Sequence, residues 1–143
     1  MRRCYLDYNA TAPLRAEART AMIAAMDHFG NPSSVHAEGR AAKAIVEKAR
    51  GQIATAFGAD GADIVFTSGA TEAAALACAG RGLQGADVEH DAVAAWIRPD
   101  HLVRADGTVK ITEPETSVLQ MANSETGIVQ SLPKGLAITD ATQ

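Results

Sequence analysis

Four short polar segments of this sequence each follow a stretch that reads as extended, and each carries groups that could bind an anion or move a proton. They are Thr67–Thr71, the residue His90, Asn123–Gly127 and Asp140–Gln143. Ligands of α/β proteins bind in the crevice outside the carboxyl ends of the strands. If the preceding stretches are strands of one parallel sheet, the four segments lie on one rim and form a single polar site.

The segment Thr67–Thr71 joins the apolar run Ile64–Phe66 to an alanine-rich stretch with helical character. The unpaired N–H groups and partial positive charge at a helix N-terminus bind phosphate readily. Gly69 lets the backbone approach an anion closely, and Thr71 adds a hydroxyl donor. The lysine and long glycine loop of a Walker motif are missing, so the alternative is an ordinary helix N-cap by Ser68.

The other three segments supply an imidazole, an amide and a carboxylate. His90 could stack on an aromatic ligand or move a proton near neutral pH, and the alternative is a surface or capping histidine. The amide and hydroxyl groups of 123–127 could bind a ligand or form a polar turn closed by Gly127. Asp140 follows the apolar run Leu136–Thr139, and the alternative there is a strand with a frayed polar end.

Helices are expected in the first half of the chain. Pro13 suits the first position of a helix, and apolar residues recur behind it at three- and four-residue steps as far as Phe29. Gly30–Ser34 breaks this amphipathic helix. A second helix runs from about Ala37 to Phe57, with Gly58 as its stop. Two further helices are expected over 70–79 and 91–97.

Short apolar or alternating runs predict the strands. We expect strands at 64–66, 87–89, twice within 103–111 around the turn Asp106–Gly107, at 117–122 and at 136–139, with a short extended segment at 4–7. Strands that alternate with helices indicate an α/β fold with a mostly parallel sheet flanked by helices. No repeat, low-complexity tract or linker divides the chain.

Composition argues against several classes of function. The 143 residues are 47% hydrophobic with a net charge of −4, which gives no support to nucleic-acid or anionic-membrane binding. No apolar run approaches the ~20 residues of a membrane span, and no signal-peptide core follows Met1. Cys4 and Cys78 lack metal-type spacing. We expect a cytoplasmic protein with no metal site and no nucleic-acid or membrane partner.

Six segments of the chain are distinctive in composition and in order. They are Tyr5–Thr11, Phe29–His36, Ile64–Glu72, Val88–His90, Ala122–Gly127 and Asp140–Gln143. Together they resemble the motifs of cysteine desulfurases, which are pyridoxal 5'-phosphate (PLP) enzymes of the class V aminotransferase fold. The resemblance implies that residues 1–143 are an N-terminal segment plus an incomplete large, PLP-binding domain of fold type I, without the family's C-terminal half.

The resemblance also implies which residues bind the cofactor. Ala70 and Thr71 would hold its phosphate at the helix start. His90 would stack on the pyridine ring and carry protons as a catalytic residue. Asp140 would pair with the ring nitrogen and keep it protonated, so that the ring can act as an electron sink. Gln143 would hydrogen-bond the phenolic oxygen of the ring.

Two further positions match the family with differences. Asn9 resembles a position near the substrate. Ser124 stands where the family commonly has the second of two consecutive asparagines on the cofactor side, and its shorter side chain would lose that contact or make it through water. The stretches 79–88, 97–117 and 130–140 are shorter than in the family, which predicts trimmed helices or strands there.

The covalent groups of the family's reaction have no counterpart in these residues. The family's PLP-binding lysine follows the aspartate–glutamine motif, and its sulfur-accepting cysteine lies far beyond. The four lysines of the chain lie in other contexts: Lys43, Lys48, Lys110 and Lys134. Neither Cys4 nor Cys78 lies in a flexible serine- and glycine-rich loop. We therefore expect no desulfurase turnover from the 143 residues alone.

The resemblance implies conversion of L-cysteine to L-alanine, with the sulfur passed on as a persulfide for iron–sulfur cluster assembly. The implied partners are a second copy in a homodimer, the missing C-terminal part of the enzyme, and iron–sulfur scaffold or sulfur-acceptor proteins. The alternatives are another class V enzyme such as a selenocysteine lyase, and a truncated, non-catalytic module that binds PLP or a partner. A generic phosphate-binding α/β domain is a remaining alternative that does not explain the order of the six motifs.

Overall fold

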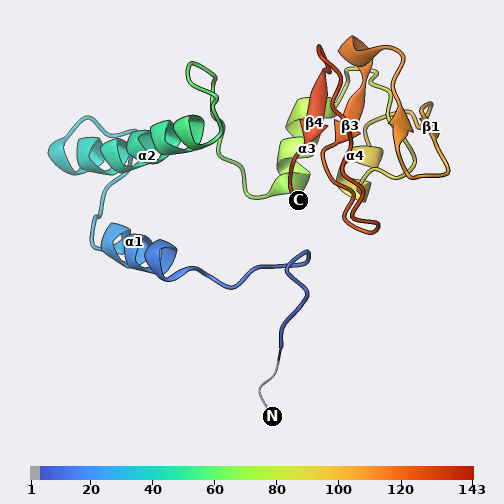
Figure 1. Ribbon diagram of the computed structural model, residues 1–143. Helices are drawn as coiled ribbons and strands as arrows, with labels where there is room; N and C mark the ends of the chain where they lie inside the picture. Colours follow the sequence, from blue (N-terminus) through green and yellow to red (C-terminus); the bar gives the residue numbers. More distant parts are fainter. Residues whose placement is uncertain (1–3) are drawn as a thin grey trace. The chain divides into compact units, whose positions relative to one another are not determined.

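The computed structural model describes residues 4–143, with helices and short strands in the order α1, α2, α3, α4, β1, β2, η1, β3, β4 (Figure 1). Contacts between residues divide the chain into two compact units. Unit 1 is Met1–Phe66 and unit 2 is Thr67–Gln143. No Gly- or Pro-rich linker marks this division in the sequence.

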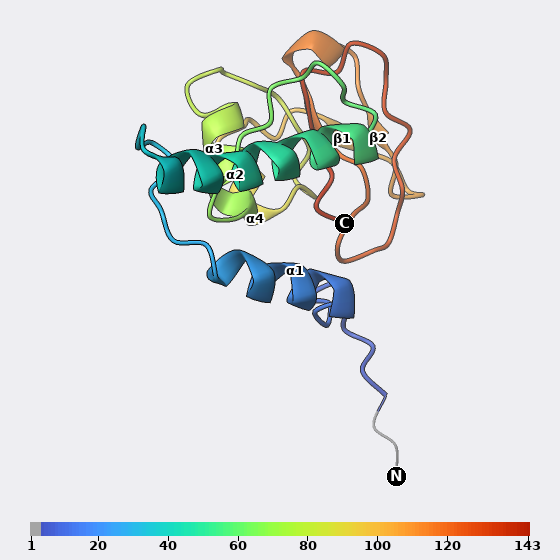
Figure 2. The same cartoon turned by 90° about the vertical axis from the view of Figure 1, so that its left-hand side faces the viewer.

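Unit 1 contains two helices, α1 (Ala16–Met26) and α2 (Ala37–Ala56), which Figure 2 shows joined by an irregular segment. The expectation that Pro13 opens the first helix is wrong, because the chain stays extended through Arg15, the N-cap of α1. The expected end of α2 is confirmed. Gly58 follows it with a φ of +61°, a left-handed conformation that glycine adopts without steric cost.

The turn before α2 depends on two glycines. A Cβ on Gly30 would lie 2.4 Å from the carbonyl oxygen of Glu38, and one on Gly39 would lie 2.4 Å from the carbonyl oxygen of Ser34. Both distances are well inside van der Waals contact. The Gly30–Ser34 break therefore folds tightly against the first turn of α2.

The predicted strand at 64–66 is absent, since these residues are extended but pair with no other strand. A strand needs a neighbour to satisfy its backbone groups, and a side chain takes that place here. The Arg50 guanidinium donates to the carbonyl of Ile64 and lies 4.9 Å from the centre of the Phe66 ring.

Unit 2 contains the α/β part of the fold. Strands β3 (Val118–Gln120) and β4 (Ile138–Asp140) pair in parallel, with Gln120 opposite Asp140. Single parallel bridges join Gln84 to Ser117 and to Arg98, so a row at Gln84 lies beside the start of β3 and a row at Arg98 lies beyond it. The expected mixed α/β fold with parallel pairing is confirmed, with strands shorter than the predicted 117–122 and 136–139.

The helices of unit 2 pack on this parallel pair. Figure 1 shows α3 (Ala70–Cys78) beside β4, and the core joins α3, α4 (Asp91–Ala94) and β3 through buried apolar side chains. The core residues are Cys78, Leu83, Val93 and Val118, with Leu119 also buried. α4 is shorter than the predicted 91–97, because the chain turns at residues 95–97 to reach the bridge at Arg98.

A hairpin lies between α4 and β3. Strands β1 (Leu102–Val103) and β2 (Val109–Lys110) pair antiparallel around the predicted turn at Asp106–Gly107. The short helix η1 (Pro114–Thr116) then leads into β3. The predicted strand at 87–89 is wrong: these residues form a turn, in which the N–H of Glu89 donates to the carbonyl of Ala86 at 3.3 Å.

Candidate functional site

The carboxyl ends of β3 and β4 bring three of the predicted polar segments together. The N–H of Met121, just after β3, donates to the carbonyl of Asp140 at 2.7 Å. The side chain of Asn123 donates to the carbonyl of Val88 at 2.9 Å. The structure therefore joins the His90 turn, the 123–127 loop and Asp140 at one edge of the parallel pair, as the sequence predicts.

Asp140 ends β4 half-buried, with its two carboxylate oxygens in different environments. Oδ1 accepts from the N–H of Thr142 at 2.9 Å and from its hydroxyl at 2.5 Å. Oδ2 has no hydrogen-bond partner within residues 4–143. The turn at Thr142 thus fixes the carboxylate and leaves one oxygen for a cationic or N–H group of a ligand.

His90 is the N-cap of α4. Its Nδ1 accepts the N–H of Ala92 at 3.1 Å, while the side chain as a whole is exposed. The alternative interpretation of a capping histidine is therefore confirmed, and it restricts the chemistry. With Nδ1 committed to the backbone, Nε2 is the ring nitrogen that can exchange a proton with a ligand.

The carbonyl of Val88 fixes the position of the His90 turn. It accepts from Nε2 of Gln120 at 3.0 Å as well as from Nδ2 of Asn123. Both donors are almost fully buried, at 4% and 7% exposure. Two side chains from the end of β3 thus hold the backbone just before His90, a role that the sequence pattern indicates for neither of them.

The 123–127 loop closes on Asn123. Its Oδ1 accepts the N–H of Glu125, and both the N–H and the hydroxyl of Thr126, at 2.8–3.0 Å. Gly127 closes the turn with a φ of +70°. The alternative of a polar turn is therefore correct for the loop backbone. Ser124 is half-buried at its start.

Glu89 is the least expected member of the site. Its side chain is 5% exposed, Oε1 accepts the N–H of Gln120 at 3.1 Å, and Oε2 is buried without a partner in the described residues. Burial raises the pKa of Glu89 to about 7, the Gln120 hydrogen bond opposes the rise, and the charge of Asp140 adds to it. An acidic residue beside a loop histidine gives no sequence signal of such burial.

The start of α3 is the segment predicted to bind an anion, and its first turn carries the Glu72 carboxylate. No side chain caps the helix, because Ser68 donates its N–H and hydroxyl to the Glu72 carboxylate, both at 2.7 Å. The alternative of an N-cap by Ser68 is therefore wrong. Ala70 and Thr71 are exposed in the first turn, where the N–H groups of a helix have no intrahelical partner. Figure 1 shows the first turn of α3 at the same end of unit 2 as the carboxyl end of β4.

The remaining two predicted residues are Asn9 and Gln143. Asn9 lies in the turn Tyr8–Ala10 of unit 1. Gln143 is exposed after β4 and follows the turn in which Thr142 contacts Asp140. The structure therefore brings His90, Ser124 and Asp140 together through their loops.

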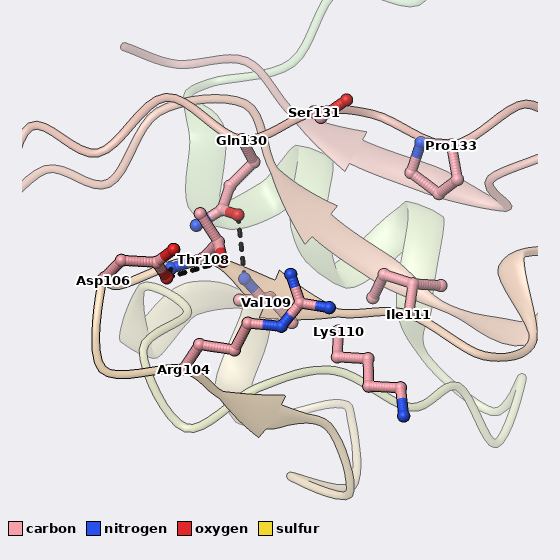
Figure 3. Close-up of a pocket in the computed structure, with 9 residues that line it drawn as sticks. All are labelled: Arg104, Asp106, Thr108, Val109, Lys110, Ile111, Gln130, Ser131 and Pro133. Carbon is pink, nitrogen blue, oxygen red and sulfur yellow. Dashed lines mark hydrogen bonds between the residues drawn. The ribbon is translucent and has the colours of Figure 1, made fainter.

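A pocket in unit 2 is lined by other residues. It measures about 350 Å³, and Figure 3 shows the β1–β2 hairpin on one side and the segment 130–133 on the other. Gln130 holds the two sides together, since its Oε1 accepts from Val109 N–H and its Nε2 donates to the carbonyl of Gly107. The lining of this pocket includes none of the predicted site residues.

Residues 4–143 contain no cluster of three or more His, Cys, Asp or Glu side chains that could hold a metal ion. No helix among them is long and apolar enough to cross a membrane.

Comparison with known proteins places the chain in a family. The model of the family "Aminotransferase class-V" matches residues 4–111, more than half of the chain. The chain is 42% identical over 116 residues to "Cysteine desulfurase IscS" of Dictyoglomus turgidum, covering 74% of the chain and 29% of the relative. It is 47% identical over 83 residues to "Cysteine desulfurase IscS 1" of Archaeoglobus fulgidus, covering 57% and 22%.

The chain is also similar to a selenocysteine lyase and to a solved structure. The lyase, from Homo sapiens, is 32% identical over 181 residues, covering 93% of the chain and 40% of the lyase. The X-ray structure of a NifS-like protein from Rickettsia africae matches with a TM-score of 0.74 and 29% identity, covering 88% of the chain and 41% of that structure.

The alignments also show what the chain lacks relative to these proteins. It spans less than a third of the two desulfurases. The alignment with the lyase extends over 181 positions, more than the 143 residues of the chain, so the lyase has internal segments that the chain lacks. This agrees with the predicted shortening inside the chain.

Proposed function

This chain belongs to the class V aminotransferase family, and we propose that it is the N-terminal, cofactor-binding part of a PLP-dependent cysteine desulfurase. The observation that carries the proposal is the 42–47% identity to desulfurases. It is supported by the polar loops that meet at one edge of the β3–β4 pair. The family is PLP-dependent, and that PLP binds here is part of the proposal.

The groups present fit the two charged ends of PLP. Ala70 and Thr71 at the uncapped start of α3 would take the phosphate, which helix N-termini bind readily. Asp140 would take the pyridine nitrogen through Oδ2, while Thr142 holds Oδ1. Bound PLP supplies an electron sink for charge that develops on the substrate. Gln143 would donate to the phenolic oxygen.

The residues around the ring would orient it and move protons. His90 would stack on one face, held by its capping bond to Ala92, and Nε2 would carry a proton to or from the substrate. Ser124 would meet the cofactor side with a hydroxyl where relatives of the family commonly have an amide. Asn9 would contact the substrate.

The proposed reaction removes sulfur from L-cysteine. The carbon–sulfur bond of cysteine breaks, the sulfur joins a cysteine thiolate of the enzyme as a persulfide, and L-alanine leaves with a proton in place of the sulfur. The lysine that binds PLP and the sulfur-accepting cysteine would come from residues beyond these 143. A homodimer, a cytoplasmic location and delivery of sulfur to iron–sulfur scaffold or other acceptor proteins complete the proposal.

A selenocysteine lyase is the second candidate. The specific observation in its favour is the alignment with the human lyase, which covers 93% of the chain against 74% for the Dictyoglomus desulfurase. The sequence identity over the matched region is lower, at 32% against 42%. We favour the desulfurase for that reason.

A direct assay separates these functions. The purified full-length protein is titrated with PLP and followed by absorbance, and alanine formation is then measured with L-cysteine and with L-selenocysteine. With a thiol reductant present to release sulfide from the persulfide, we expect PLP binding and alanine with sulfide from L-cysteine. Alanine from selenocysteine alone would assign the lyase, and PLP binding without either product would assign a non-catalytic binding module.

A turnover assay of the isolated 143-residue chain is a second test. We expect a preparation verified by intact mass to give no turnover, because none of its lysines or cysteines lies in the context that the chemistry needs. We expect turnover when the C-terminal part of a desulfurase is supplied, either covalently or as a second chain. Sulfide and alanine production by the 143 residues alone would overturn the assignment of the covalent groups.

A further inference from the structure

Glu89 is the one carboxyl group in the described residues that is buried with an unpartnered oxygen. A buried polar atom without a partner costs free energy, and in native structures it calls for an explanation. The proposed function gives Glu89 no role, although it directly precedes His90 and its Oε1 accepts from Gln120, directly opposite Asp140 in the β3–β4 pair.

The contacts of Glu89 tie the two ring-binding groups to one another. On one side, Glu89 and the Val88 carbonyl both bind Gln120, through its backbone N–H and its side-chain amide. On the other side, Glu89 interacts electrostatically with Asp140. A change at the Glu89 carboxyl therefore reaches both the His90 turn and the Asp140 charge.

The ionisable groups around Glu89 are acidic. Asp140 of β4 is one, and the buried thiol of Cys78 in α3 is the other. Burial raises the pKa of Cys78, Arg81 opposes this rise, and Glu89 and Asp140 add to it. Within the described residues, no cation contributes to the charge balance of Glu89 itself.

We propose that Glu89 is a positioning residue of the cofactor site. Its protonated carboxyl holds the His90 turn against β3 through the Gln120 N–H, and it leaves Asp140 as the single negative charge at the pyridine ring of PLP. This inference rests on the proposed function. Ionisation of Glu89 would place a buried carboxylate beside the half-buried carboxylate of Asp140 with no cation to balance it, and that arrangement is costly. The cost of burying this charge should therefore weaken the site as pH rises through neutrality, even though the ionised carboxyl accepts the Gln120 N–H more strongly.

The test compares three variants of the purified full-length protein by PLP affinity at pH 6 and pH 8. Glu89→Gln keeps an acceptor for the Gln120 N–H and cannot ionise, Glu89→Ala removes the acceptor, and Glu115→Gln makes the same chemical change at an exposed glutamate of η1. We expect wild type and E115Q to bind PLP more weakly at pH 8 than at pH 6, and E89Q to lose most of this difference. We expect E89A to bind roughly 10-fold more weakly at both pH values, the size of loss that outer-shell groups cause at metal sites.

Three results would overturn the proposal. They are E89Q binding as weakly as E89A at pH 6, E89Q keeping the pH dependence of wild type, and E89A binding as wild type does. The pH dependence of apoprotein stability provides a readout without PLP. Because the folded-state pKa of Glu89 is raised from 4.5 to about 7, its stabilising contribution is full below pH 4.5 and is lost as pH rises through 7. E89Q should lack this fall. If wild type binds no PLP, the proposed function fails, and this stability profile still decides the state of Glu89.

Discussion

The two units of this chain differ in how much of their apolar side-chain surface is buried. Among residues 4–66, Gly39 alone is buried, and large apolar side chains such as Phe29 and Phe57 are about 80% exposed. Unit 2 buries Val118, Leu119 and Cys78 almost completely. Helices thus form in unit 1 without a core of their own, whereas the polar site of unit 2 stands on packed strands and helices.

This difference shows which parts of the site have a fixed geometry. The backbone before His90 is held by the buried side chains of Gln120 and Asn123. Asp140 ends a strand that pairs with the buried strand β3. Groups placed on such frameworks are the more precise ones. Asn9 lies on a turn of unit 1, whose apolar surface is uncovered. Exposed apolar patches of this kind mark surfaces that bind other protein segments.

The largest expected effect contrasts Asp140 in unit 2 with Asn9 in unit 1. In the PLP-loaded enzyme, Asp140→Ala should reduce kcat on the order of 100-fold or more, the loss that follows removal of one preorganised electrostatic group, because an unprotonated ring nitrogen is a poor electron sink. Asn9→Ala should mainly raise KM for L-cysteine and leave the PLP absorbance spectrum unchanged. Steady-state kinetics and the spectra check both. Near-wild-type turnover of D140A would refute the role of Asp140.

The second prediction concerns packing. Leu119→Ala in unit 2 should lower the free energy of unfolding by roughly 2–5 kcal/mol, since the leucine is 1% exposed and its removal leaves a cavity. Phe29→Ala in unit 1 should change it by less than about 0.5 kcal/mol, as for other exposed positions. Urea denaturation followed by circular dichroism measures both. Equal losses would show that Phe29 is covered in solution and would remove the contrast between the units.

Local sequence patterns predicted the helices better than the strands. The three-four spacing of apolar residues and a glycine stop place α2 within a residue, because these signals lie inside the segment itself. The run Ile64–Phe66 has the composition of a buried strand but pairs with Arg50 and no strand. Pairing is non-local, and a short apolar run does not specify its partner.

The sequence predicted only part of the site, because some of its contacts are also non-local. Asp140, His90 and the 123–127 loop could be found because each stands at a turn or strand end in the sequence. Glu89 and Gln120 could not be found, because their roles depend on a hydrogen bond between residues far apart in the chain. Asn123 offered a weak signal, as an asparagine opening a polar turn that ends in glycine.

The third prediction asks which unit makes the chain associate. Strand β4 has one neighbour in the described residues and exposes Thr139, so it is an open edge for pairing. Unit 1 exposes more apolar surface, and we expect the 143-residue chain to self-associate at micromolar concentration. Phe29→Ser with Phe57→Ser should reduce association more than Thr139→Lys in sedimentation velocity. A monomeric wild type that melts cooperatively would contradict this expectation and favour a self-sufficient binding module.

The smallest expected effect compares two histidines that cap helices, one in each unit. His36 accepts the N–H of Gly39 at 3.4 Å before α2, and His90 accepts the N–H of Ala92 at 3.1 Å before α4. Replacing either histidine by alanine should cost about 1 kcal/mol of stability or less, the usual loss of a cap. Asparagine should restore this stability because its side chain also accepts a hydrogen bond.

PLP affinity and the pH profile of kcat separate the two positions. His90→Asn should keep stability but alter both properties, since it removes the ring and Nε2, whereas His36→Asn should alter neither. Equal behaviour of the two asparagine variants in the PLP titration would mean that His90 only caps α4, and that the proton carrier of the proposed reaction lies elsewhere.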